Sequence, residues 1–341
     1  MHRSCVNRAL PIREALLHRR VWRAIYIHER FHSSAMGRPC TIDDGDWVDH
    51  DDPEDRINLE LARMSGILGD ILRQVYRPRN ISSEAAAALA SRIQQWSDRL
   101  PPDLTIDYLL RNKQIPQPTR SALLRLQLTH LNCIILLTRP FLVDVVARAV
   151  AQRSQGCSFQ ITGTIERLAR ACVLAATRSV EITQSLFVDN ARPQRPAWLI
   201  YFLFVAGLVL MLDAYRDKSL ILNPSIVCVK IIMQSYASLD PAADRYHQVF
   251  EKMEDAIISD GSNGSTDVLG ELLSGTSAGP SSTGGEDMNV CHFLNQQMTN
   301  MAMERGTTGS TMPFEFDHSS YWDPMMLGDP DFRGLLMNPE Y

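Results

Sequence analysis

The stretch INLELARMSGILGDILRQV, residues 57–75, decides the fold class of this chain. Its apolar residues recur at alternating spacings of four and three, at Ile57, Leu61, Met64, Leu68, Ile71 and Val75. Because an α-helix turns once in about 3.6 residues, this spacing places all six side chains on one face. The pattern predicts an amphipathic helix whose apolar stripe faces a core.

The same helical period continues after that stretch. A second apolar stripe runs from Leu89 to Leu100. Either Ser82 or Ser83 is a suitable N-cap, since a serine hydroxyl accepts a hydrogen bond from a free amide of the first turn. The proline that follows, Pro101, predicts the end of this helix.

Most of the remaining chain up to residue 258 has the same character. A helix is predicted over residues 121–137, and Pro140 is expected to begin a new one, because proline suits the first helical position. Further helices are predicted over residues 163–187, 197–215, 223–238 and 242–258. No segment alternates apolar and polar residues in the manner of a strand. We therefore predict an all-α, multi-helix, bundle-like domain.

The composition changes near residue 259. Residues 259–287 are rich in Ser, Gly, Thr and Asp, and such a segment buries too little apolar surface to offset the entropy of ordering. We therefore expect a helical domain over residues 1–258, a Ser/Gly/Thr-rich linker over 259–311, and a disordered acidic-hydrophobic tail over 312–341.

The tail combines bulky apolar residues with carboxylates. The apolar residues that could contact a partner are Phe314, Phe316, Tyr321, Trp322, Phe332 and Leu335. Acidic residues keep such side chains solvated and accessible, which is typical of an acidic activation segment. An ordinary disordered tail and a last helix that docks on the domain are the alternatives.

Residues 197–212 read AWLIYFLFVAGLVLML and contain no charged residue. A helix of that length measures about 24 Å, which is shorter than the roughly 30 Å hydrocarbon core of a membrane. A helix that is apolar on every side also occurs at the centre of a large helical domain. We therefore interpret this segment as a buried core helix, with a membrane span as the alternative.

The sequence His28-Glu29-Arg30-Phe31-His32 matches the H-E-x-x-H motif of zinc peptidases. In that chemistry two histidines on one helical face hold zinc, and the glutamate activates water. Arg30 places a fixed positive charge between the general base and the second ligand. Glu54 or Glu60 could supply a third ligand, but nothing in the sequence marks either residue. We therefore favour a helix with partly exposed histidines over a metal site.

Charge is distributed unevenly along the chain, which carries a net charge of −5. Residues 1–40 contain eight arginines and two glutamates, and residues 41–55 contain eight acids and no base. The basic side of the helix over residues 13–30 could reach nucleic acid phosphates. The acidic run that follows is an equally available internal partner, and we favour ion pairs between the two.

Three short segments, in order along the chain, carry residues that together form a recognisable set of motifs. They are Arg19, Arg20, Trp22, Tyr26, Glu29, Arg30, Gly37, Arg38 and Pro39 in the first, Trp96 before Leu100-Pro101 in the second, and Arg139, Pro140 and Phe141 in the third. This ordered set resembles the regulatory domain, or middle homology region, of fungal zinc-cluster transcription factors. The resemblance implies a nuclear regulator of RNA polymerase II-dependent transcription, and not an enzyme.

The charged residues of the first segment have a structural interpretation within that resemblance. We expect Arg20, Arg30 and Arg38 to tie the acidic loop to the helix through bidentate pairs. Gly37 would let the chain leave the helix, and Pro39 would prevent its continuation.

The chain also departs from the family. Family members bind DNA through a six-cysteine zinc cluster, and the seven cysteines of this chain include no C-x-x-C pair. The resemblance therefore implies no cofactor in this chain, and DNA contact only through a zinc cluster that it lacks. It also begins partway into the family's domain, so we expect an N-terminally incomplete domain with an exposed apolar patch.

The expected partners are transcription machinery or co-regulators, with a homodimer or heterodimer as a further possibility and no membrane. Two alternative functions stay open. One is a helical interaction module that does not bind DNA and competes with full-length factors. The other is the zinc peptidase based on His28, Glu29 and His32.

Overall fold

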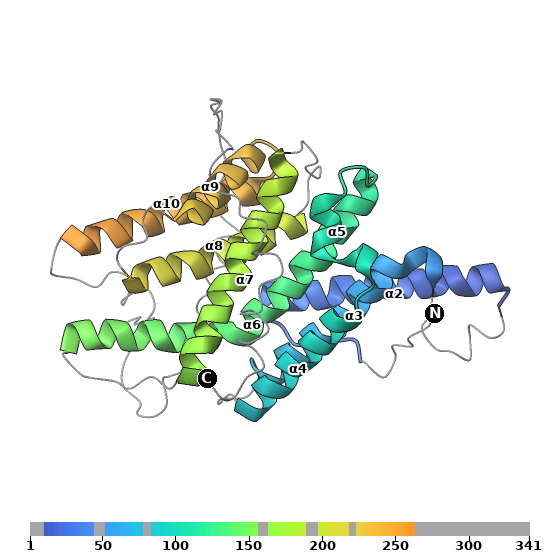
Figure 1. Ribbon diagram of the computed structural model, residues 1–341, viewed down its shortest axis with the longest axis horizontal. Coiled ribbons are helices and arrows are strands. Elements are labelled where there is room, and N and C mark those ends of the chain that lie inside the picture. The colour runs from blue at the N-terminus through green and yellow to red at the C-terminus, as the bar shows by residue number, and fades with distance from the viewer. Residues whose placement is uncertain are drawn as a thin grey trace.

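The computed structural model describes residues 10–43, 52–77, 83–155, 163–188, 197–217 and 223–262 (Figure 1). Within these ranges the chain forms helices and no strand, which confirms the all-α prediction. The α-helices are α2 (Ile12–Met36), α3 (Arg56–Gln74), α4 (Ser83–Arg99), α5 (Ile106–Arg111), α6 (Gln117–Gln155), α7 (Gly163–Val188), α8 (Ala197–Asp217), α9 (Pro224–Ala237) and α10 (Pro241–Ser262). Two short 3₁₀ helices, η2 (Pro53–Asp55) and η3 (Pro102–Leu104), precede α3 and α5.

Helix α3 carries the stripe that predicted the fold, and it lies between α2 and α6. Its stripe residues Leu61, Met64, Leu68 and Ile71 are buried in the core, as the spacing predicts. Helix α4 packs on α3 and α6 through Leu89, Ile93 and Trp96, which are also buried. The helix begins at Ser83, and Ser82 lies outside the described residues.

The prediction that Pro140 begins a new helix is wrong, because α6 continues through it. A proline inside a helix lacks the N–H that would bond the carbonyl four residues earlier. That carbonyl belongs to Leu136, and here the Tyr76 hydroxyl donates to it over 2.8 Å. A side chain from the loop after α3 therefore replaces the missing backbone hydrogen bond, and the helix is not interrupted.

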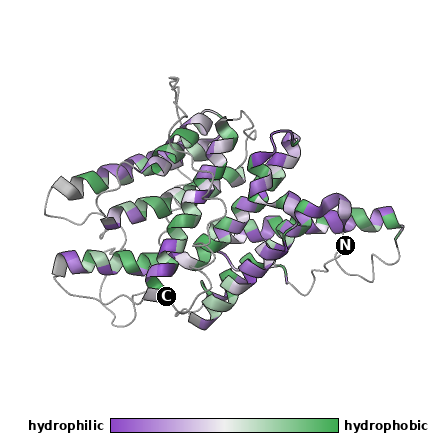
Figure 2. Cartoon of the chain, viewed as in Figure 1, coloured by the Kyte–Doolittle hydropathy of each residue, from purple (hydrophilic) through white to green (hydrophobic). Residues whose placement is uncertain are grey.

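The predicted core helix, α8, lies among α6, α7, α9 and α10. In the described part of the chain, Ala197–Arg216 is the one helix segment long and apolar enough to cross a membrane, and most of it is buried inside the protein. Figure 2 shows apolar residues along α7 and α8 where the helices meet. The burial agrees with a core helix.

Helices α9 and α10 cover the other side of α8 and end the described part of the chain. Asn223 caps α9 by accepting a hydrogen bond from the Ser225 amide, at 2.9 Å. Helix α10 ends at Ser262, so the boundary predicted at residue 258 falls within its last turn. The rest of the linker and the tail, including Phe314, Phe316, Tyr321, Trp322, Phe332 and Leu335, lie outside the described residues.

Candidate functional site: the arginine-rich helix α2 and its acidic partners

Helix α2 ends as predicted at Gly37. This residue has a φ of 62°, in the left-handed region that suits glycine, and the Arg38 amide donates to the Ser33 carbonyl over 3.0 Å. Pro39 follows in non-helical backbone and cannot extend the helix. The chain therefore turns away from the helix at the Gly-Arg-Pro sequence.

The first ion-pair cluster joins α2 to the segment just before α3. Arg20 binds Asp52 through two hydrogen bonds of 2.9 Å and also contacts Glu54 at 2.9 Å. Arg23, which is 2% exposed, pairs with Asp55 and lies 3.6 Å from Asp52. The hydrogen bonds from Arg20 lower the pKa of Asp52, although burial opposes this. The basic face of the helix thus binds the acids that follow it, as expected from the charge pattern.

The second cluster lies two turns further along α2. Arg30 is fully buried, donates to the Ile42 carbonyl over 2.8 Å and pairs with Glu29. Its guanidinium lies over the Tyr26 ring, 4.5 Å from the ring centroid. Arg30 therefore attaches the chain beyond Gly37 to the helix through a backbone carbonyl, whereas a bidentate pair with an acid of the loop was expected of it.

Glu29 completes this cluster by accepting hydrogen bonds. The Thr41 amide donates to it over 2.6 Å, and the Ser33 hydroxyl over 3.1 Å. Burial raises the pKa of Glu29, but the Thr41 amide and the charge of Arg30 outweigh it, so the pKa lies below its ordinary value. The carboxylate is thereby held ionised by structural partners.

Of the two glycines that face α2 from α3, Gly69 lets the helices approach closely. A Cβ at Gly69 would lie 2.7 Å from Nε of Arg30, whereas one at Gly66 would meet only the Tyr26 hydroxyl at 3.4 Å. Gly69 is therefore the position at which the buried arginine requires the absence of a side chain. The local sequence pattern alone does not indicate this role of Gly69.

The remaining predicted residues of the first segment occupy different surroundings. Arg19 and Trp22 are partly buried, while Arg38 and Pro39 are exposed. Arg38 forms no ion pair with another described residue. The acids at positions 44–51 lie outside the described residues, so its role toward them stays a prediction. Arg23 fills the buried position instead, and its spacing from Tyr26 and Arg30 on one helical face could have indicated this.

The second and third predicted segments also meet α3. The Trp96 indole donates to Glu60 over 2.9 Å in the core. Arg139 is buried with its guanidinium over the Tyr76 ring, 5.2 Å from the centroid, and Phe141 packs against the core. All three segments therefore contact α3 or the residues that directly follow it.

The H-E-x-x-H residues do not form a metal site in the described part of the chain. His28 and His32 stack on the exposed side of α2, with ring centroids 6.2 Å apart. Glu29 is engaged with Thr41, while Glu60 binds Trp96. Among the described residues, no group of three or more His, Cys, Asp or Glu side chains could hold a metal ion.

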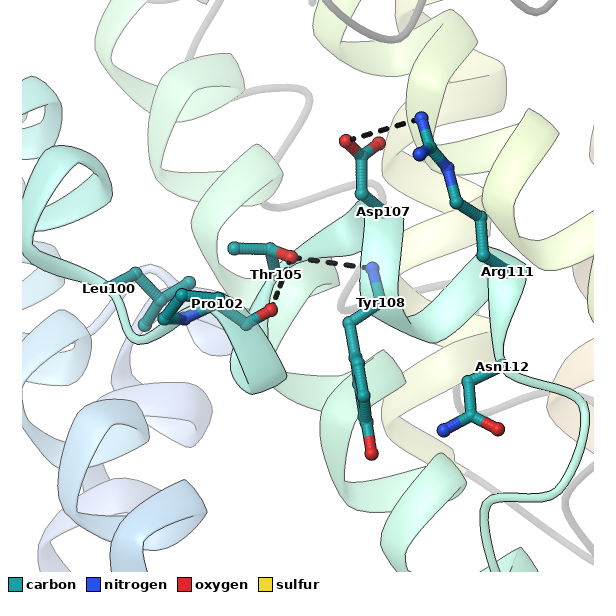
Figure 3. Close-up of a pocket in the computed structure, with 7 residues that line it drawn as sticks. All are labelled: Leu100, Pro102, Thr105, Asp107, Tyr108, Arg111 and Asn112. Atoms are coloured by element: carbon teal, nitrogen blue, oxygen red, sulfur yellow. Dashed lines mark hydrogen bonds and ion pairs between the residues drawn. The ribbon is translucent and has the colours of Figure 1, made fainter.

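A shallow pocket of about 610 Å³ lies at the surface where η3 leads into α5 (Figure 3). Thr105 caps α5 by accepting from the Tyr108 amide over 3.3 Å, and Asp107 lies 3.8 Å from Arg111. The polar groups that Figure 3 draws thus serve the short helix itself. We assign no ligand to this pocket.

Comparison with known proteins gives a consistent indication of function. No family model matches the chain, and no solved structure does. It is 29% identical to filamentous growth regulator 27 of Candida albicans, over 41% of this chain and 20% of the relative. It is 24% identical to an uncharacterized transcriptional regulatory protein of Schizosaccharomyces pombe, over 54% of this chain and 24% of the relative.

A third relative is transcription factor FBD3 of Gibberella moniliformis, which is 23% identical over 62% of this chain and 32% of its own length. The chain thus corresponds to about a fifth to a third of the length of these relatives. None of the three names is that of an enzyme. At low identity, therefore, this chain is related to fungal regulators of transcription.

Proposed function

We propose that this chain acts in the nucleus as a regulator of RNA polymerase II-dependent transcription. In this proposal the helical domain modulates activity, and the tail over residues 312–341 contacts transcription machinery or co-regulators. The observation that carries it is the similarity to named fungal regulators over 41–62% of this chain.

In this proposal the charged residues around α2 have a structural rather than a catalytic role. Arg20, Arg23, Glu29 and Arg30 are engaged with one another or with neighbouring loops, and their interactions hold α2 against α3. Buried, mutually paired charges of this kind fix the geometry of a domain. In the proposed family, DNA contact and zinc come from a six-cysteine cluster, which the present sequence does not contain.

A tethering experiment tests the proposal without requiring DNA binding by this chain. The full chain, fused to an unrelated DNA-binding domain, is expressed in a fungal host with a reporter that carries the matching binding site. We expect reporter transcription to change at least about threefold relative to the DNA-binding domain alone, a difference of about 0.65 kcal/mol. An unchanged reporter, with the fusion present in the nucleus at normal abundance, would contradict the proposal.

Tail variants locate the activity within that fusion. Replacing Phe314, Phe316 and Trp322 with alanine should abolish activation, because these side chains supply the apolar contact area for a partner. The matched control replaces Ser319 and Ser320, which lie between them, with alanine. Equal losses from both variants would exclude a specific role for the aromatic residues.

The exposed apolar residues of α2, described below, favour a second candidate function, a helical interaction module that competes with full-length factors. That function predicts an unchanged tethered reporter. It also predicts that overexpression of the untethered chain lowers transcription from a promoter driven by a full-length relative.

A further inference from the structure

Helix α2 presents an apolar stripe that no described part of the chain covers. Leu17, Val21 and Ile25 are exposed and stand four residues apart, so they lie along one face of the helix. His28 and His32 extend the same face toward the end of the helix and are also exposed. We call these five residues the α2 stripe.

The opposite face of the helix makes the contrast clear. Arg23, Tyr26 and Arg30 are buried against α3 and its flanking loops. Figure 1 shows the N-terminal half of α2 projecting beyond the other helices at the right of the view. An exposed row of branched apolar side chains on a projecting helix is available for contact with another segment.

Among the described residues, a positive charge without an ion pair borders the α2 stripe. Arg125 of α6 is partly buried beside His28 and forms no ion pair or side-chain hydrogen bond with a described residue. Burial lowers its pKa, as expected for a cation without a carboxylate nearby. Arg13 and Glu14 are both exposed near the start of α2, so the positive charge is concentrated at the Arg125 end of the stripe. A partner with carboxylates would therefore be favoured here.

The tail of this chain has the complementary composition. Residues 312–341 contain six acids and one base, Arg333, with aromatic residues between them. We propose that this tail docks on the α2 stripe, with its aromatic residues on Leu17, Val21 and Ile25 and its carboxylates toward Arg125.

The length of the chain permits this contact. The 49 residues from 263 to 311 separate the end of α10 from the tail, and an extended chain spans up to about 3.4 Å per residue, about 170 Å in total. A domain of about 250 residues has a radius of gyration of only about 18 Å. Because tethering raises the effective concentration to the millimolar range, a weak contact of this kind suffices for docking.

The charges also favour the tail, rather than a second copy of the chain, as the partner of the α2 stripe. Two copies that paired through the α2 stripe would bring two positively charged borders together, which is unfavourable. The tail brings negative charge to the same border. Under the proposed function, docking would keep the aromatic residues of the tail away from transcription machinery. Only this consequence of docking rests on the proposed function.

Photo-crosslinking in the full chain tests the docking directly. The chain is made with Ile25→p-benzoylphenylalanine or, as the matched control, Ile231→p-benzoylphenylalanine. Both isoleucines are 45% exposed, but Ile231 lies on α9, at the opposite side of the molecule in Figure 1. After irradiation of the monomer at low micromolar concentration, crosslinked peptides are identified by mass spectrometry. We expect crosslinks from position 25 to residues 312–341, at least about fivefold more abundant than from position 231, a difference of about 1 kcal/mol.

A second comparison separates docking from chance proximity. Arg125→Gln should lower the yield at position 25 at least about twofold, about 0.4 kcal/mol, and this variant should fold because it removes a desolvated, unpaired charge. Equal yields at positions 25 and 231 would overturn the proposal, as would crosslinks found in a dimeric fraction alone, which would assign the stripe to a second copy. The crosslink needs no transcription readout, so it distinguishes failure of docking from failure of the proposed function.

Discussion

Replacing Arg23 with methionine isolates the energetic role of the buried ion pairs between α2 and α3. Methionine keeps much of the length of the side chain and removes its charge. Arg23 is 2% exposed and pairs with Asp55, with Asp52 at 3.6 Å. The variant therefore leaves two carboxylates without this partner, one of them buried.

The expected loss of stability depends on the hydrogen bonds that Asp52 and Asp55 keep in the variant. Removing one member of a buried ion pair destabilises a protein by about 3–5 kcal/mol. Asp52 keeps its two hydrogen bonds from Arg20, and Asp55 keeps one from the Asn58 amide at 2.7 Å. We therefore expect a loss of about 3 kcal/mol, at the low end of that range. In a domain of this size, such a loss lowers Tm by about 6–12 °C.

The matched control is Arg56→Met. Arg56 binds Asp103 through two hydrogen bonds of 3.0 Å, but both side chains are nearly half exposed. An exposed pair contributes at most about 1 kcal/mol even when its geometry is good. The comparison therefore sets a buried arginine–aspartate contact against an exposed one whose two hydrogen bonds give it the better geometry.

The assay is thermal and denaturant unfolding of the full chain, followed by circular dichroism at a helical wavelength. Both variants and the parent protein are compared at neutral pH and the same salt concentration. If Arg23→Met is within about 0.5 kcal/mol of Arg56→Met, the buried cluster does not stabilise the α2–α3 packing and our reasoning is refuted.

Two further perturbations test the same interface. Gly69→Ala should destabilise the domain by about 1–2 kcal/mol, because overpacking against Arg30 outweighs the better helix propensity of alanine. Gly66→Ala should be neutral or stabilise by up to about 1 kcal/mol, so equal effects in urea titrations would contradict the close approach. Stability should also fall in acid through Asp52, whose pKa is depressed from 3.8 chiefly by hydrogen bonds from Arg20. Its contribution is fully present above pH 3.8 and is lost as the pH falls through the lower folded value. Unfolding midpoints between pH 2 and 5 should therefore vary less in Asp52→Asn; an unchanged pH dependence would exclude this carboxylate as a source.

Several features could be predicted from the sequence because they depend on local period and composition. The stripe of α3 follows from spacing alone, since only one face of a helix can present those residues to a core. The burial of α8 follows from the absence of charge over residues 197–212. The end of α2 follows from Gly37, whose φ of 62° is unfavourable for other residues.

Tertiary structure determined which charged side chains become buried and which groups they bind. Composition indicated that the arginines of α2 would meet the acidic run. Which arginines become buried depends on the approach of α3, and these are Arg23 and Arg30 rather than the exposed Arg38. The H-E-x-x-H match is likewise a property of spacing in one helix, whereas the Glu29 carboxylate bonds Thr41, which lies beyond the end of that helix.

Pro140 shows the physical reason for this division. Sequence period and proline chemistry predict a break there, because they describe only bonds between residues near one another in the chain. The Tyr76 hydroxyl lies 60 positions before Leu136 in the sequence, yet it supplies the hydrogen bond that the proline removes. Local rules determine which helices can form, while contacts between distant residues decide where those helices continue and which charges become buried.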